Sequence, residues 1–183
     1  LSANAFDGSD ERVIISTESR QLYRDPQFSA DGEKIFFIRF EIIGGEEYWS
    51  LVEIPASGGS GGGERVIIPA RKPKISEIGV LKNGNGLLVN AVDPISNLPQ
   101  LYHVSVNDGA ETRVTNDLNA YFGVSVSDDG KTMVAAQRQF ANNIWVFPSE
   151  NASLAKELTK ESNIYSNAVW TPDGKIVYDA VDN

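Results

Sequence analysis

The sequence has no cysteine, one histidine and one methionine in 183 residues. The absence of cysteine excludes a disulfide framework, a thiol nucleophile and a thiolate metal site, and it fits any compartment. No apolar run approaches the roughly 20 residues that cross a bilayer as a helix, so we predict no membrane insertion in this segment. Basic residues are also few: 16 Lys and Arg against 25 Asp and Glu give a net charge of −9, which disfavours nucleic acid as a partner.

The residues needed for common catalytic sites are missing too. The single histidine, His103, has no Gly-x-Ser-x-Gly nucleophile elbow to work with, so a Ser-His-Asp hydrolase is not predicted. Asp128-Asp129 is short of the roughly six to eight oxygens that calcium takes, and Gly130-Lys131-Thr132 lacks the upstream glycine of a phosphate loop. We therefore predict that the chain is not an enzyme and holds no metal or cofactor.

What the sequence does contain is a repeated hairpin. Asp31-Gly32, Asp129-Gly130 and Asp173-Gly174 each stand between apolar runs, with Asn83-Gly84 as a variant copy. Asp-Gly and Asn-Gly tolerate the positive φ angles of a tight turn between antiparallel strands. The turn glycines recur after 52, 46 and 44 residues, a period that marks a repeat architecture.

Two further segments recur in step with the turn. The pentapeptide Glu-Arg-Val-Ile-Ile stands at 11–15 and again at 64–68, and an aromatic strand recurs at 48–54, 101–106 and 143–147. Each cycle thus contains four β-like segments in fixed order, which is the content of one propeller blade.

The predicted fold is an all-β propeller segment with about three full four-stranded blades and partial blades at both ends. The blades are expected at 22–69, 72–116 and 119–160, with a partial blade at 163–183 and a loose N-terminus at 1–10. The Gly/Ser run at 56–63 is expected to be the most mobile internal segment. The expected core comprises Phe28, Ile35, Phe37, Trp49, Leu87, Val89, Val126, Val134, Trp145, Trp170 and Val177.

The Ser/Thr-x-Asp-Gly-Lys turn followed by an apolar strand, with Asn143-Ile144-Trp145-Val146 further on, resembles the WD40-like propeller repeat of bacterial TolB-type proteins. The stretch 115–174 looks like the propeller region attached to bacterial eukaryote-like serine/threonine kinases and winged-helix regulators, although the chain has no kinase motif. The second cycle departs from the family pattern at its turn and over 93–99. The resemblance implies a periplasmic or extracytoplasmic location.

One set of residues recurs at the same position of the cycle. Three of four cycles place a tyrosine five residues before the last apolar residue of the turn-entering strand, and the second cycle has Ser76 there. If these strands line the propeller axis, the residues would ring one mouth of its channel. The predicted binding residues are Tyr23, Arg24, Asp25, Tyr121, Phe122, Tyr165 and Asn167. The alternative is structural, with each tyrosine packed on the neighbouring blade.

These observations predict a non-catalytic module that binds a protein or peptide, as the sensor or interaction part of a larger bacterial signalling protein. The alternative is an accessory, gating propeller of a TolB-like peptidase whose catalytic domain lies elsewhere. Open blade faces at both ends also predict a homodimer that pairs them. The alternative is a defective four-bladed ring in which the strand at 13–15 is the outermost strand of the last blade.

Overall fold

The computed structural model describes residues 2–3, 9, 11–16, 21–58, 63–82, 84, 86–127, 129–139, 142–160 and 164–181. The chain forms two compact units: unit 1 comprises Leu1–Asn116 and Tyr121–Ala136, and unit 2 comprises Asp117–Ala120 and Gln137–Asn183. Apart from the 3-10 turn η1 (Ala152–Leu154), every regular element in the described ranges is a β-strand, which confirms the predicted all-β class. Among the described residues, no helix is long and apolar enough to span a membrane.

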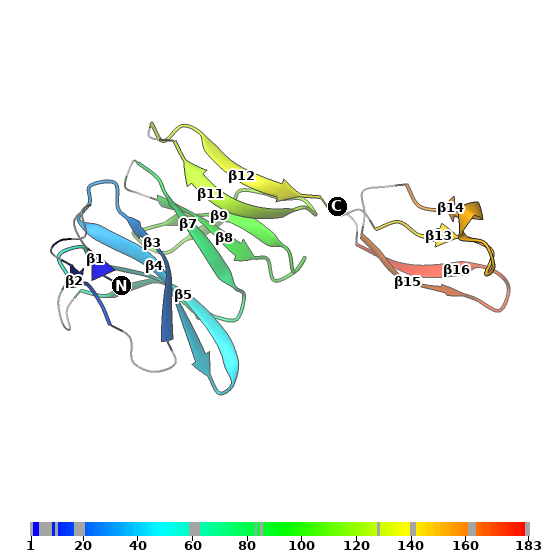
Figure 1. Cartoon of the computed structure of the whole chain (residues 1–183), viewed down its shortest axis with the longest axis horizontal. Helices are drawn as coiled ribbons and strands as arrows, with labels where there is room; N and C mark the ends of the chain where they lie inside the picture. The colour runs from blue at the N-terminus through cyan, green and yellow to red at the C-terminus, as the bar shows by residue number, and fades with distance from the viewer. Residues whose placement is uncertain are drawn as a thin grey trace. The chain divides into compact units, whose positions relative to one another are not determined.

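The first four-stranded sheet, blade 1, is antiparallel and runs in chain order (Figure 1). Its strands are β3 (Gln21–Phe28), β4 (Lys34–Ile43), β5 (Glu46–Pro55) and β6 (Arg65–Arg71). Strand β4 is buried at every position from Ile35 to Ile38. This pattern arises because both faces of the sheet are covered, as an unbroken apolar run predicts.

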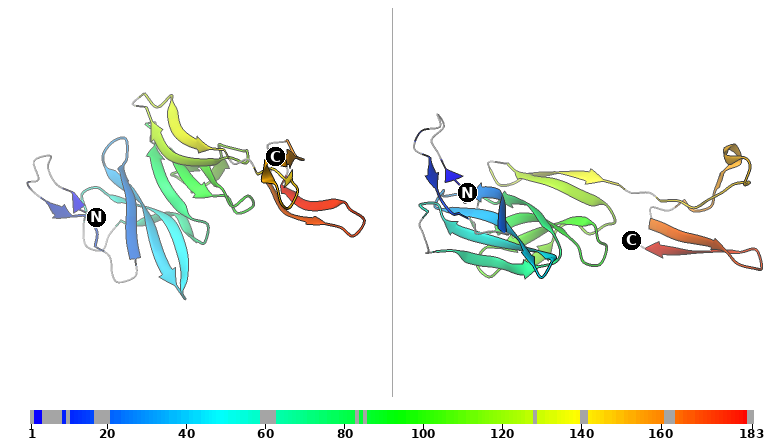
Figure 2. Two further views of the ribbon diagram at one scale, coloured as in Figure 1. Left: turned by 45° about the vertical axis from the view of Figure 1, so that its right-hand side comes forward. Right: turned by 60° about the horizontal axis from the view of Figure 1, so that its bottom comes forward.

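The second sheet, blade 2, repeats this topology with β7 (Ile75–Val80), β8 (Gly86–Val92), β9 (Pro99–Ser105) and β10 (Glu111–Arg113). The blades pack face to face, because Phe36, Ile38 and Leu51 of blade 1 share one buried apolar cluster with Leu87 and Val89 of blade 2. Figures 1 and 2 show the two sheets side by side within unit 1. Stacked four-stranded antiparallel sheets are the architecture of a β-propeller.

The repeated turn has the predicted hairpin geometry in all four cycles. Gly32, Gly84, Gly130 and Gly174 have positive φ angles of 76°, 72°, 68° and 80°. In three cycles the turn aspartate accepts a hydrogen bond of 2.6 Å from the Ser or Thr hydroxyl two residues earlier. The turn itself therefore accounts for Asp129, and this reading needs no bound calcium.

The third cycle differs from the expected four-stranded blade at 119–160. Strands β11 (Ala120–Val126) and β12 (Met133–Arg138) form one two-stranded sheet, and β13 (Trp145–Val146) and β14 (Lys156–Glu157) form another. All six residues of β12 are exposed, and β13 and β14 are each two residues long. The last hairpin, β15 (Ile164–Trp170) and β16 (Ile176–Val181), stands where the partial blade is predicted.

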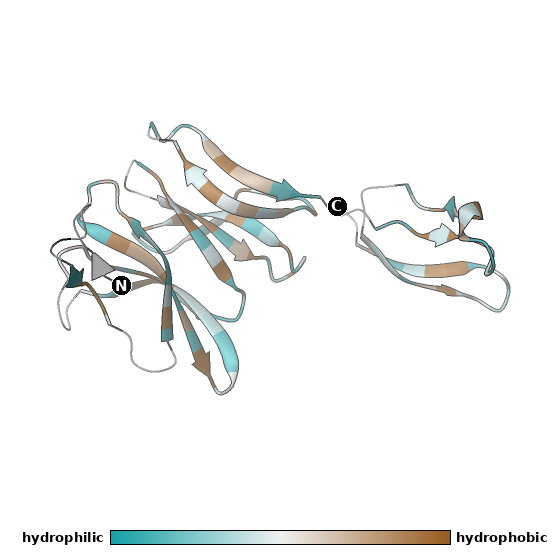
Figure 3. Cartoon of the chain, viewed as in Figure 1, coloured by the Kyte–Doolittle hydropathy of each residue, from teal (hydrophilic) through white to brown (hydrophobic). Residues whose placement is uncertain are grey.

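The predicted core is correct in blades 1 and 2 except at Phe28, and it is mostly wrong beyond them. Ile35, Phe37, Trp49, Leu87 and Val89 are buried, whereas Val126 is partly buried. The expected core residues that are exposed instead are Phe28, Val134, Trp145, Trp170 and Val177. Apart from Phe28, which lies beside the first turn, these residues belong to two-stranded sheets, where a second layer does not cover both faces. Figure 3 shows the apolar stretches that β12 and β16 carry on such sheets.

The N-terminal segment packs on blade 1. Strand β2 (Arg12–Val13) pairs with β1 (Ser2–Ala3), and Ile14 is buried against the blade. Most of the predicted loose N-terminus, and residues 59–62 of the Gly/Ser run, lie outside the described residues. The expected mobility of that run therefore stays a prediction.

Candidate functional site

The predicted channel-mouth residues lie on the first strands of three hairpins. Tyr23, Arg24 and Asp25 are on β3, and Tyr121 and Phe122 are on β11, both in unit 1. Tyr165 and Asn167 are on β15 in unit 2. The grouping of all seven residues around one channel stays a prediction.

These strands share a backbone distortion two residues after the repeated tyrosine. Asp25, Gly123 and Asn167 have positive φ angles of 50°, 65° and 52°. The register of β3 against β4 shifts just after Arg24, and that of β15 against β16 shifts just after Ser166, as in a β-bulge. In blade 1 the bulge aims a side chain at the next blade, because the Asp25 carboxylate accepts a hydrogen bond from the backbone N–H of Ile78. Asp25 therefore links the inner strand β3 of blade 1 to the inner strand β7 of blade 2 by a hydrogen bond.

The tyrosines contact their own sheets. The Tyr23 ring packs on Phe37 of β4 with centroids 4.8 Å apart, and the Tyr165 ring packs edge-on against Tyr178 of β16 at 5.5 Å. Burial, followed by the negative charge of Glu64, raises the pKa of Tyr23. The alternative expectation, that each tyrosine packs on the neighbouring blade, stays a prediction.

Arg24 forms the centre of a different cluster. Its guanidinium carbon lies 5.9 Å from the ring centroids of both Phe40 and Trp49, and the Lys74 ammonium lies 5.7 Å from the Trp49 ring. Both cations are exposed, and neither has an acidic partner among the described residues. Cations within about 6 Å of an aromatic face are attracted to it, which holds these side chains in place without neutralising their charge. We call Arg24, Phe40, Trp49 and Lys74 the cation cluster.

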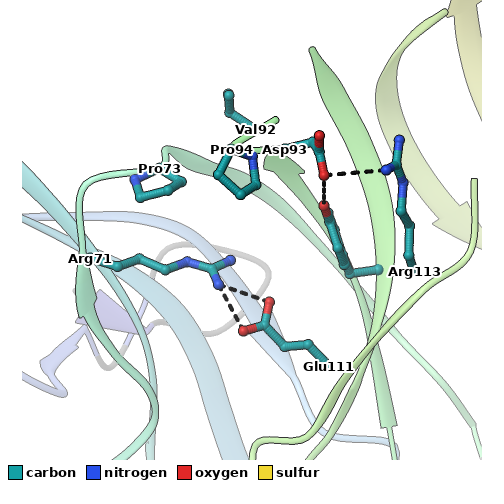
Figure 4. A pocket seen from close by; sticks show the side chains of 8 residues that line it. Arg71, Pro73, Val92, Asp93, Pro94, Glu111 and Arg113 are labelled. Atoms are coloured by element: carbon teal, nitrogen blue, oxygen red, sulfur yellow. Dashed lines mark hydrogen bonds and ion pairs between the residues drawn. The ribbon is translucent and has the colours of Figure 1, made fainter. Parts of the chain in front are cut away.

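A cavity of about 310 Å³ is lined by residues that neighbour the cation cluster along the chain or across the sheet. Pro73, next to Lys74, forms part of its wall, and Arg71 is the cross-strand partner of Trp49. The cavity lies between the end of β6 in blade 1 and, in blade 2, the end of β8, the β8–β9 connection, β9 and β10 (Figure 4). Its lining consists of Arg71, Pro73, Val92, Asp93, Pro94, Tyr102, Glu111 and Arg113.

The charged side chains of the cavity are paired with one another. Arg71 Nη1 donates to both carboxylate oxygens of Glu111, at 2.7 and 2.9 Å, and Arg113 Nη1 lies 3.3 Å from Asp93 Oδ2. Figure 4 shows both pairs across the opening. Only the Nε of Arg71 is buried without a hydrogen-bond partner among the described cavity residues. The cavity is therefore close to neutral, with proline and valine walls suited to an apolar or uncharged side chain.

Asp93 is the anchor of this network. Burial opposes ionisation of Asp93, but hydrogen bonds from Ser96 and Tyr102 outweigh it and hold the pKa of the carboxyl below its usual value. Burial, followed by the bond to Asp93, raises the pKa of Tyr102 to about 12. Tyr102 is thus a fixed hydrogen-bond donor at neutral pH, and the pair positions the β8–β9 connection.

Sequence reasoning found Arg24 and missed Lys74 and the cavity. The available signal is the second cycle's departure from the repeat pattern over 93–99. In the structure this departure forms the turn that carries Asp93 and Pro94 into the cavity. Arg71 and Lys74 lie on either side of Pro73 in the connection between the blades, where sequence alone gives no partner.

His103 lies on β9, where Leu88 and Thr112 are its cross-strand partners. Its Nε2 would lie 2.3 Å from a Cβ at Gly86, so the missing side chain of Gly86 makes room for the imidazole. No cluster of three or more potential metal ligands occurs among the described residues. These contacts fit a structural histidine.

Comparison with solved structures shows which class of fold the chain has, whereas comparison of sequences shows no relative. No family model matches the sequence, and no curated protein matches it. The structure is similar to β-propellers, and the fold is the one found in TolB. TolB from Acinetobacter baumannii superposes with a TM-score of 0.56 at 20% identity, over 94% of this chain and 41% of that one.

Two other solved structures are similar to this chain over most of its length. Prolyl oligopeptidase B from Galerina marginata matches with a TM-score of 0.50 at 20% identity, over 93% of this chain and 23% of that one. A puromycin hydrolase matches with a TM-score of 0.50 at 12% identity, over 94% of this chain and 36% of that one. The chain thus spans less than half the length of each of these proteins.

Proposed function

We propose that the chain is a non-catalytic propeller module that binds an acidic segment of a protein or peptide at the cation cluster. The observation that carries this proposal is the pair Arg24 and Lys74. Both are exposed, both are held over the Trp49 ring, and neither has an acidic partner among the described residues. In a chain with a net charge of −9, two adjacent cations without counter-charges favour an anionic group on the partner.

The neighbouring cavity supplies the second element of recognition. Because Arg71 and Arg113 are already paired with carboxylates, the cavity offers little net charge and mainly apolar walls. A segment with an acidic side chain over Trp49 could insert an adjacent apolar side chain between Pro73 and Pro94. The charge contact then provides salt-dependent attraction, and the apolar contact provides specificity. As the interaction part of a larger signalling protein, the module would report the presence of such a segment.

The test is a binding titration with two unstructured, fluorescein-labelled peptides, one of repeating Glu-Pro-Leu and one of repeating Lys-Pro-Leu. We expect the native chain to bind the acidic peptide and not the basic one, and to bind it more weakly as salt rises. The Arg24→Glu/Lys74→Glu variant should weaken binding by at least about tenfold, because like charges then face each other.

The matched control is Lys131→Glu/Lys156→Glu, which changes the net charge equally at exposed positions of other elements. This control should retain most of the affinity. Equal binding of the acidic and basic peptides, or equal loss in both double variants, would show that the cation cluster is not the site.

The similarity to prolyl oligopeptidase B favours a second candidate function, the accessory propeller of a peptidase. The two proposals differ in what adjoins the chain in its complete reading frame. A downstream hydrolase segment supports the accessory role, and an upstream kinase or DNA-binding segment supports the sensor role.

A further inference from the structure

The repeated pentapeptide Glu-Arg-Val-Ile-Ile occurs in two structural settings. Residues 64–68 lead into β6, the outermost strand of blade 1, whereas residues 11–15 precede blade 1 and include β2. Identical residues in two places permit a direct comparison of their contacts.

The copy at 64–68 fastens blade 1 to blade 2. Arg65 donates from Nη2 to the backbone oxygen of Val106 at 2.5 Å and from Nη1 to that of Asn107 at 3.4 Å. Two residues further on, Ile67 is buried in the cluster shared by the two blades. Its backbone approaches Gly109 so closely that a Cβ there would lie 2.3 Å from the Ile67 oxygen. Arginine, isoleucine and the facing glycine together form a latch between the sheets.

The copy at 11–15 makes the same contacts with blade 1. Arg12 donates from Nη2 to the oxygen of Ala56 at 3.0 Å and from Nη1 to that of Ser57 at 3.1 Å. Ile14 is 4% exposed and belongs to the apolar cluster of that face. A Cβ at Gly58 would lie 3.3 Å from the Ile14 Cα. The same nitrogen atoms thus bind the same type of carbonyl pair.

The two acceptor surfaces are equivalent in the repeat. Pro55 pairs with the first residue of β4 and Ser105 with the first residue of β8, so the carbonyl pairs that follow them correspond. The apolar faces correspond as well. The blade 1 face contains Ile35, Phe37, Ile54 and Ala56, and the matching blade 2 positions are Leu87, Val89, Val104 and Val106. Blade 1 therefore presents to residues 11–15 the surface that blade 2 presents to blade 1.

One contact differs between the latches. Arg65 is oriented by Glu53 of its own sheet, whose Oε1 lies 2.8 Å from Arg65 Nε. Arg12 has no ion pair among the described residues, and β2 is two residues long where β6 has seven. The latch at 11–15 therefore lacks the carboxylate and the long strand that hold its counterpart in place.

We propose that this outer face of blade 1 is a docking surface for an extended strand with arginine at one position and isoleucine two residues later. Residues 11–15 fill the surface in cis as a displaceable latch. The partner is an outermost strand of this Arg-x-Ile pattern, supplied in trans by another β-sheet. The surface is separate from the cation cluster, and its use does not depend on what that cluster binds.

The experiment is a fluorescence-anisotropy titration of the full chain with a labelled peptide of the sequence Ser-Asp-Glu-Arg-Val-Ile-Ile-Ser-Thr. The Ile14→Asp variant disables the cis latch, and Val13→Asp is its matched control because Val13 is the adjacent residue and is 67% exposed. We expect the peptide to bind Ile14→Asp at least about tenfold more tightly than the native chain or Val13→Asp. A peptide with alanine for arginine should lose at least about tenfold in affinity, since two charge-assisted hydrogen bonds are removed.

Equal affinity for Ile14→Asp and Val13→Asp, or no binding to either, would overturn the proposal, as would equal binding of a scrambled peptide. The fold of each variant is checked by circular dichroism. If Ile14→Asp is unfolded, the milder Arg12→Ala variant takes its place in the titration. If both are unfolded, recovery of a cooperative transition on addition of the peptide supports the proposal, and failure to recover it overturns it.

Discussion

Truncation of Trp49 and of Trp145 to alanine should have very different effects on stability. The two tryptophans hold corresponding places in the repeated aromatic strand, but Trp49 is 5% exposed and Trp145 is 50% exposed. Trp49→Ala leaves a cavity in the core and should lower the free energy of unfolding by about 3–5 kcal/mol. It also removes the ring beneath Arg24 and Lys74, each contact contributing about 0.5–1 kcal/mol at an exposed site.

Trp145→Ala removes about half of a tryptophan's contact area and creates no enclosed cavity. At about 25 cal/mol per Å² over roughly 100 Å², the loss should not exceed about 2.5 kcal/mol. The assay is urea unfolding followed by far-UV circular dichroism, with Trp49→Phe as a control that keeps an aromatic ring. A loss for Trp145→Ala as large as for Trp49→Ala would refute the reasoning, because it would mean that Trp145 is buried in solution.

Three further predictions concern pH, catalysis and assembly. Tyr102 has a folded-state pKa of about 12 against an ordinary value of 10.0, so its stabilising effect is present below pH 10 and lost as pH rises toward 12; Tyr102→Phe should flatten this alkaline loss in thermal melts. The chain should hydrolyse no peptide, ester or phosphate substrate, and turnover abolished by His103→Ala would contradict this expectation. The exposed apolar residues of β12, β15 and β16 predict a dimer in light scattering after size exclusion; a stable monomer at micromolar concentration would exclude it.

Sequence reasoning predicted the parts of the fold that depend on local patterns. The Asp-Gly turns, the all-β class and the buried run from Ile35 to Ile38 follow from turn chemistry and strand periodicity, and the structure confirms them. Burial beyond blade 2 could not be predicted in this way. Val177 corresponds to the buried Phe36 of blade 1 but is exposed, because burial depends on which sheet covers a residue, and sequence periodicity does not specify that neighbour.

The candidate site shows the same limit. The sequence predicts Arg24 and Asp25 as site residues because they directly follow the repeated tyrosine. Their roles come from contacts across the blades: Arg24 joins Lys74 over Trp49, and Asp25 binds the backbone of Ile78. Lys74 and Arg71 lie in a connection without repeat character, so no periodic signal marks them.

The Arg65–Glu53 ion pair also makes the contact between the two blades dependent on pH. Burial opposes ionisation of Glu53, but hydrogen bonds from Arg65 and Lys34 outweigh it and hold its pKa below the usual 4.5. A lowered pKa in the folded state means stability that is present above pH 4.5 and lost as pH falls through the folded value. The Arg65 guanidinium donates hydrogen bonds both to Glu53 and to two backbone carbonyls of blade 2. Protonation of the Glu53 carboxylate therefore removes the ion pair that orients the arginine between the two sheets. Acid should therefore weaken the contact between the two sheets.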